Sequence, residues 1–75
     1  MPKSDNQKLK IFYILDYLQR NSHRSHPVGA GELTRMLEHS HGISCDRKTI
    51  YSDVAALQEY GVDIVSVPGK GGGYY

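Results

Sequence analysis

The chain has 75 residues, of which 39% are hydrophobic and 23% charged, and its formal net charge is +1. This length suits one small domain and excludes two, and the composition excludes a disordered chain. The small net charge gives no sign of a nucleic-acid partner. The charges are segregated along the chain, however, because most charged residues in 1–24 are basic and all those in 53–63 are acidic. A domain with one basic face requires such a segregation.

The first helix is predicted over residues 7–20, after a disordered segment at residues 1–6. Its apolar residues recur at the i, i+3, i+4, i+7 spacing that places them on one helix face: Ile11, Ile14, Leu15 and Leu18. Leu9 and Phe12 lie off this stripe. We interpret them as the edge of the core, and contact with a partner subunit or a further domain is the alternative.

A loop follows at residues 21–29, because Asn, Ser and Pro in NSHRSHPVG are typical of turns, and a short strand is expected near Val28. The second helix is predicted from Ala30 to His39 or Ser40, with Leu33, Met36 and Leu37 as its apolar stripe. Gly42 then stands where a left-handed C-cap is common.

The third helix is predicted over residues 47–60, because Asp46 is a good N-cap and Gly61 is a residue that commonly ends a helix. At about 100° per residue, one side of this helix is apolar and is expected to face the core: Ile50, Val54 and Leu57. The remaining segment, VDIVSVPGKGGGYY, is β-rich. It predicts a strand over residues 62–67, a Gly-rich turn and a return strand over residues 73–75.

These elements predict an α+β fold, a winged helix-turn-helix of three helices and a C-terminal two-stranded β-hairpin. The second and third helices, joined by a short Gly-containing connector, form the helix-turn-helix, and the hairpin at residues 62–75 forms the wing. The predicted core comprises Ile11, Leu15, Leu18, Leu33, Leu37, Ile43, Ile50, Val54, Leu57 and Ile64.

The outer side of the third helix is small and polar, with Lys48, Ser52, Ala55 and Glu59 on it and Thr49, Tyr51 and Ala56 flanking it. A merely solvated face would more often carry long Glu, Lys and Gln side chains throughout. Small residues allow a close approach to another surface, and basic and hydroxyl groups at a positive helix N-terminus can donate to phosphates and base edges. This pattern favours a helix that enters the DNA major groove. An ordinary amphipathic helix with a charged cap is the alternative.

The candidate DNA-binding residues are Ser44, Arg47, Lys48, Thr49, Tyr51, Ser52, Lys70 and Gly71. Within this set, Lys48 and Arg47 are the best candidates for guanine contacts, and Ser52 would enter the groove with them. Ser44, Thr49 and Tyr51 are expected to hold phosphates. Lys70 and the backbone of Gly71, in the turn of the wing, are expected to meet the DNA backbone or the minor groove. His41 and Lys10 are expected to extend the track of phosphate contacts.

The segment CDRKTIYSDVAALQEYGVDIVSVPGKGGGYY resembles the N-terminal winged helix-turn-helix of bacterial transcriptional regulators of the DeoR-like and WYL-domain type. These proteins have an Arg-Thr-Ile or Lys-Thr-Ile start to the recognition helix, an Arg-Asp-Leu-like continuation and a Gly-rich wing that ends in a Tyr pair. The matching positions are Lys48-Thr49-Ile50, Ser52-Asp53-Val54, Leu57, Gly61 and residues 71–75. The similarity covers nearly the whole chain and is strongest from Gly42 onward.

The resemblance implies sequence-specific binding to double-stranded DNA, with the full-length protein a homodimer on a palindromic operator. The isolated domain offers little interface, so a monomer is an alternative for the domain alone. It also implies a C-terminal sensor domain for an unknown effector, so residues 1–75 are expected to be the N-terminal domain of a longer protein. Ser52 departs from the pattern, since the family often has Arg there. We expect this difference to narrow or change the target sequence without affecting DNA binding in general.

Three other functions compete with this interpretation. Zinc could use His23, His26, His39, His41 and Cys45, but their spacing is irregular and there is only one thiol. The segment PGKGGG is unlike a nucleotide-binding P-loop, because Gly in place of Ser or Thr follows Lys70 and no helix comes after it. A winged helix that binds another protein is the third alternative, favoured by the weak net charge and opposed by the polar face of the third helix.

No acid–base or nucleophile constellation is present, so we expect no enzyme, no catalytic residue, no metal and no cofactor. Cys45 is the only cysteine, which excludes an intramolecular disulfide and fits a reducing cytosol. No apolar run reaches the ~18 residues of a membrane span. The N-terminal MPKSDNQKLK has no apolar segment typical of a signal peptide. The expected location is therefore cytoplasmic, away from the membrane.

Overall fold

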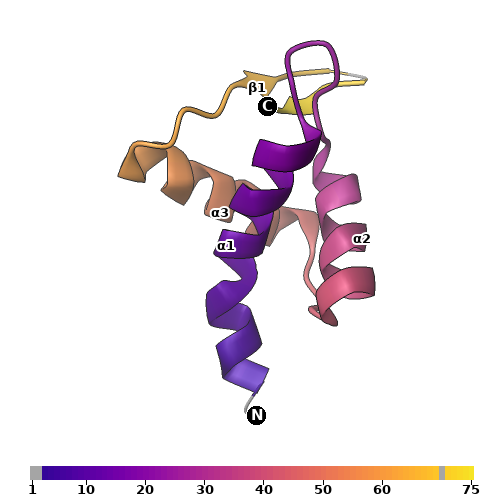
Figure 1. The fold of residues 1–75 in the computed structure, drawn as a ribbon, viewed down its shortest axis with the longest axis vertical. Coiled ribbons are helices and arrows are strands. Elements are labelled where there is room, and N and C mark those ends of the chain that lie inside the picture. The colour runs from indigo at the N-terminus through magenta and orange to yellow at the C-terminus, as the bar shows by residue number, and fades with distance from the viewer. Residues whose placement is uncertain (1–2, 70) are drawn as a thin grey trace.

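The computed structural model describes residues 3–69 and 71–75, with side chains described from Lys8 onward and omitted at residue 70. Three helices pack together, and a short hairpin lies across one end of them (Figure 1). The elements are α1 (Lys3–Asn21), α2 (Ala30–His41), α3 (Arg47–Tyr60), β1 (Ser66–Val67) and β2 (Gly73–Tyr74). The predicted winged helix-turn-helix fold is confirmed.

The helix α1 begins earlier than the sequence predicted. Its backbone is helical from Lys3, whereas the prediction placed the start at residue 7 and disorder over residues 1–6. Residues 3–7 contain neither glycine nor proline, so nothing in this stretch stops the helix from extending. Residues 1–2 of the predicted disordered segment lie outside the described residues.

The turn between α2 and α3 is fixed by local signals at both of its ends. Gly42 has a φ of 65°, and its amide donates to the carbonyl of Glu38. The helix α2 ends at His41, one or two residues later than the predicted end at Ser40 or His39. At the other end, the carboxylate of Asp46 accepts a hydrogen bond of 3.0 Å from the Thr49 amide. The predicted C-cap and N-cap are therefore confirmed. Ile43, between them, is 1% exposed and anchors the turn in the core.

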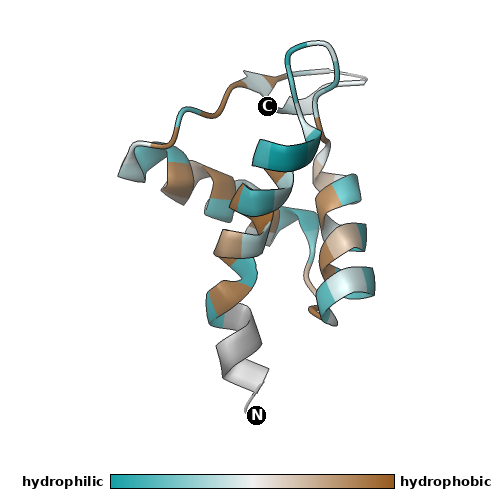
Figure 2. Cartoon of the chain, in the orientation of Figure 1, coloured by the Kyte–Doolittle hydropathy of each residue, from teal (hydrophilic) through white to brown (hydrophobic). Residues whose placement is uncertain are grey.

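The core lies where the three helices meet, and Figure 2 shows their hydrophobic residues on the sides that face one another. The buried hydrophobic residues are Ile14, Leu18, Val28, Leu33, Leu37, Ile43, Ile50, Val54 and Leu57. Ile11, Leu15 and Ile64 were predicted in the core but are only half-buried at its edge. Ile14 and Val28 were missing from the predicted core and are fully buried. The face of α1 that is buried is thus centred on Ile14 and Leu18.

The wing is shorter than predicted. Its two strands are antiparallel, with Ser66 opposite Tyr74 and Val67 opposite Gly73. The strand predicted over residues 62–67 begins late, because the backbone groups ahead of it bond to α3. The Val62 amide donates to the carbonyl of Leu57 (2.9 Å), and the Ile64 carbonyl accepts from the side chain of Gln58 (2.9 Å).

A third short strand segment ties the wing to the helices. The Val28 amide donates to the Tyr74 carbonyl, and the Tyr74 amide donates to the Val28 carbonyl, each over 2.8 Å. The strand expected near Val28 is therefore present as a single antiparallel bridge. Gly73 permits this approach, because a Cβ atom at that position would collide with the carbonyl of Val28.

Candidate nucleic-acid interface

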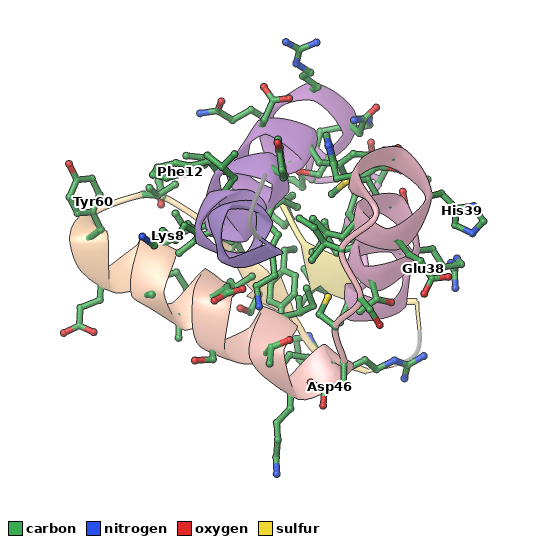
Figure 3. All side chains as sticks on the ribbon, turned by 90° about the horizontal axis from the view of Figure 1, so that it is seen from below. Lys8, Phe12, Glu38, His39, Asp46 and Tyr60 are labelled. Carbon is green, nitrogen blue, oxygen red and sulfur yellow. The ribbon has the colours of Figure 1, made fainter. Side chains whose placement is uncertain are left out.

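The helix α3 presents a polar side to solvent. Ile50, Val54 and Leu57 are buried, as the helical periodicity predicted. The exposed residues on the opposite side are Lys48, Thr49, Tyr51, Ser52, Ala55, Ala56 and Glu59. Figure 3 shows Asp46 at the start of α3, at the opposite end from Tyr60. The side predicted to meet DNA is therefore free of other parts of the described chain.

The residues in and just before the first turn of α3 differ in whether their side chains are already hydrogen-bonded. Lys48 and Ser44 are exposed, and no hydrogen bond or ion pair of their side chains occurs among the described residues. Thr49 is exposed too, but its hydroxyl donates to the carbonyl of Asp46 over 2.8 Å. This hydroxyl can therefore accept a hydrogen bond but has already used its proton.

Removing the cap at Asp46 is expected to destabilise the domain by about 1 kcal/mol. The Asp46→Ala variant leaves the Thr49 amide without its carboxylate partner, at the turn that carries Lys48. The urea midpoint of unfolding measures the loss. Asp46→Ser, which can still cap the helix, is the matched control and is expected to stay close to the wild type. A midpoint for Asp46→Ala equal to that of Asp46→Ser would contradict the role of the cap.

The guanidinium of Arg47 lies beside α2. A methyl group added to Gly31 would be 3.2 Å from Nη2 of Arg47 and 3.6 Å from Nη1 of Arg35. Arg47 was predicted to reach outward beside Lys48, but its side chain is directed toward the second helix. Sequence reasoning did not single out Arg35. In the sequence, Arg35 is marked only by its position one helical turn after Gly31. The periodicity of one helix cannot show that this position lies near α3.

An open groove of about 540 Å³ separates α3 from the wing. It is lined by Tyr51 of α3, by residues 66–69 and 72–74 of the wing, and by Gly29 and Ala30 at the start of α2. Tyr74 also lines the groove; burial raises the pKa of its phenol above the usual range, and repulsion from the neighbouring Tyr51 phenolate raises it further. Tyr51 thus faces the groove.

Gly71 is exposed and has a φ of 78°, a left-handed conformation that suits glycine in the turn of the wing. Lys70, the predicted basic contact of the wing, lies outside the described residues.

The predicted phosphate contact of Lys10 is wrong. Only 9% of this residue is exposed, and its ammonium lies 3.0 Å from Oδ2 of Asp53 on α3. This ion pair joins α1 to α3 inside the helix contact, which removes the charge from solvent. His41 is half-buried and its ring stacks on Tyr13, with 3.6 Å between ring centroids and an interplanar angle of 7°.

A second exposed area lies away from the start of α3. Leu9 is 42% exposed, Phe12 61% and Tyr60 89%. Figure 3 shows Phe12 and Tyr60 on the same side of the molecule as Lys8, away from Asp46. Leu9 and Phe12, interpreted as the edge of the core, are thus exposed and are not among the buried or partly buried residues of the core cluster.

Within the described part of the chain, no three His, Cys, Asp or Glu side chains come together as a metal site would require. The paired loop histidines, His23 and His26, have ring centroids 6.0 Å apart. None of the helices among the described residues is long and apolar enough to cross a membrane.

A helix-turn-helix with an exposed third helix, followed by a hairpin that borders a groove beside that helix, defines a winged helix-turn-helix domain. A family model described as an HTH domain matches residues 10–75. The chain therefore belongs to the HTH domain family, whose members are DNA-binding domains and typically not enzymes. No curated protein and no solved structure matches the chain.

Proposed function

We propose that this chain is the DNA-binding domain of a bacterial, cytoplasmic transcriptional regulator of the DeoR-like or WYL-domain type. It binds double-stranded DNA sequence-specifically, with α3 in the major groove. The observation that carries this proposal is the exposed side of α3, where Lys48 is followed by the small residues Ser52, Ala55 and Ala56. Such a side allows the helix axis to come close to base edges while a basic group reaches them.

The position of each candidate residue on the domain indicates whether it would contact bases or the DNA backbone. Lys48 and Ser52, on the outer side of α3, suit the reading of bases. Ser44, just before α3, and Tyr51 carry hydroxyl groups that suit phosphate oxygens. Thr49 can donate to a phosphate only if its hydroxyl leaves the carbonyl of Asp46. From across the groove, Lys70 and the backbone of Gly71 in the wing would contact the DNA backbone or the minor groove.

We further propose that the full-length protein acts as a homodimer on a two-fold operator and that a C-terminal domain binds an effector. A homodimer that places one α3 on each half-site explains how a domain with so few base-reading side chains attains specificity.

The alternative is a winged helix that binds another protein, which the net charge of +1 favours. Selection of binding sites from random duplex DNA with the full-length protein separates the two. We expect enrichment of a two-fold motif, because two copies of α3 would read symmetric half-sites. If no sequence is enriched at low salt, the protein-binding alternative is favoured and the DNA proposal fails.

A further inference from the structure

Two arginines from different helices converge above Gly31. Nη2 of Arg47, from the first turn of α3, and Nη1 of Arg35, from α2, lie 3.2 and 3.6 Å from the point that a Gly31 methyl group would occupy. The two nitrogens are therefore no more than about 7 Å apart, a separation at which like charges repel. Gly31 leaves room for the guanidinium of Arg47 because it has no side chain.

Neither guanidinium forms an ion pair with an acidic side chain among the described residues. The ion pairs of the described residues join Lys10 to Asp53 and Arg20 to Asp16, and neither includes Arg35 or Arg47. The carboxylate of Glu32, next to Gly31 in the chain, accepts a hydrogen bond of 2.7 Å from the hydroxyl of Tyr17 instead. Neither arginine is therefore in an ion pair among the described residues, and the carboxylate of Glu32, one turn before Arg35 on α2, offsets the charge of Arg35 only in part.

The surroundings of this pair add further positive potential. The pair lies over the first turn of α2, whose N-cap, Gly29, has no side chain to cap the free amides. Gly29 and Ala30, which precede Gly31 in the chain, also line the groove between α3 and the wing. The arginine pair is thus placed beside the groove that the proposed function assigns to DNA.

We propose that Arg35 and Arg47 together bind one phosphodiester group of the DNA backbone. This inference rests on the proposed function and changes the role of Arg47 from reading guanine to holding a phosphate. Guanidinium groups suit this task, because each can donate two parallel hydrogen bonds to phosphate oxygens. A phosphate between the two arginines also removes the repulsion between them.

The test measures affinity as a function of salt concentration for Arg35→Gln, Arg47→Gln and the double variant, on the selected operator and on random duplex DNA. Each single variant is expected to bind both DNAs about tenfold more weakly, with sequence preference unchanged. The slope of log K against log salt is expected to fall by about one unit in total for the double variant, because one shared phosphate releases one counterion.

Arg20→Gln is the matched control, because it removes one arginine charge from an exposed pair on α1. Its affinity and salt slope are expected to equal those of the wild type. A loss of about two slope units in the double variant would mean two separate phosphates and would overturn the shared site. An unchanged slope, a change in sequence preference, or an equal loss in Arg20→Gln would overturn it too. If the wild type itself binds no DNA, the proposed function fails instead.

Discussion

Replacing Asp53 by alanine is expected to lower the free energy of unfolding by about 3 kcal/mol. The ammonium of Lys10 lies 3.0 Å from Oδ2 of Asp53, and the side chains are only 11% and 22% exposed. Removal of the carboxylate leaves a positive charge between α1 and α3 without its partner, which costs more than the ion pair itself contributes. Urea unfolding followed by circular dichroism measures the change.

The double variant Lys10→Met, Asp53→Leu tests whether Asp53→Ala destabilises the domain because it leaves Lys10 buried without a partner or because the ion pair itself is essential. It is expected to recover most of the stability, since well-packed apolar residues replace a buried ion pair at little cost. Oδ2 of Asp53 is buried, and the polar contact it has among the described residues is the ammonium of Lys10 at 3.0 Å.

The matched control for this pair is Arg20→Ala, which breaks the ion pair between Arg20 and Asp16 on the surface of α1. The side chains of that pair are 75% and 59% exposed, so its loss is expected to cost less than about 1 kcal/mol. An equal effect of Asp53→Ala and Arg20→Ala would show that burial gives the Lys10–Asp53 pair no special importance.

Replacing Lys48 by alanine is expected to weaken binding to the selected operator by about 1–3 kcal/mol and to relax the sequence preference at one position of each half-site. Lys48 is exposed at the start of α3, where its ammonium can reach the acceptors of a guanine. Quantitative binding to the operator, to single-base variants of it and to random DNA measures the change.

Lys8→Ala is the matched control for Lys48, because Lys8 is also an exposed lysine but lies on α1, away from Asp46 (Figure 3). It is expected to leave the sequence preference unchanged. If Lys48→Ala weakened operator and random DNA by the same factor, Lys48 would contact a phosphate alone. Substitution of Lys48 is thus expected to change the sequence preference, whereas substitution of Arg35 or Arg47 is expected to leave it unchanged.

The parts of the fold that local sequence signals determine were predicted well. Asp46 and Gly42 have their effect within one helical turn, so the sequence was sufficient to place the connector between α2 and α3. The length of the wing was not predictable in this way. The groups at Val62 and Ile64 bond to the last turn of α3, and this depends on how the chain leaves the helix.

The candidate site was only partly predictable, for a similar reason. The periodicity of α3 correctly separated Ile50 from Lys48, because side chains on one helix keep fixed directions. The same reasoning placed Lys10 on the polar side of α1, whereas the packing of α1 on α3 brings it to Asp53. The convergence of Arg35 and Arg47 likewise depends on how α2 and α3 cross, which no spacing along the chain determines.

The bridge between Val28 and Tyr74 has a consequence for motion. Val28 is fully buried among the helices, so the wing cannot swing away from α3 unless both hydrogen bonds of this bridge break next to the core. The amides of Val28 and Tyr74 are therefore expected to exchange with solvent only through openings close to global unfolding. The groove beside Tyr51 is then preorganised, and little conformational entropy would be lost if it binds a DNA backbone as proposed.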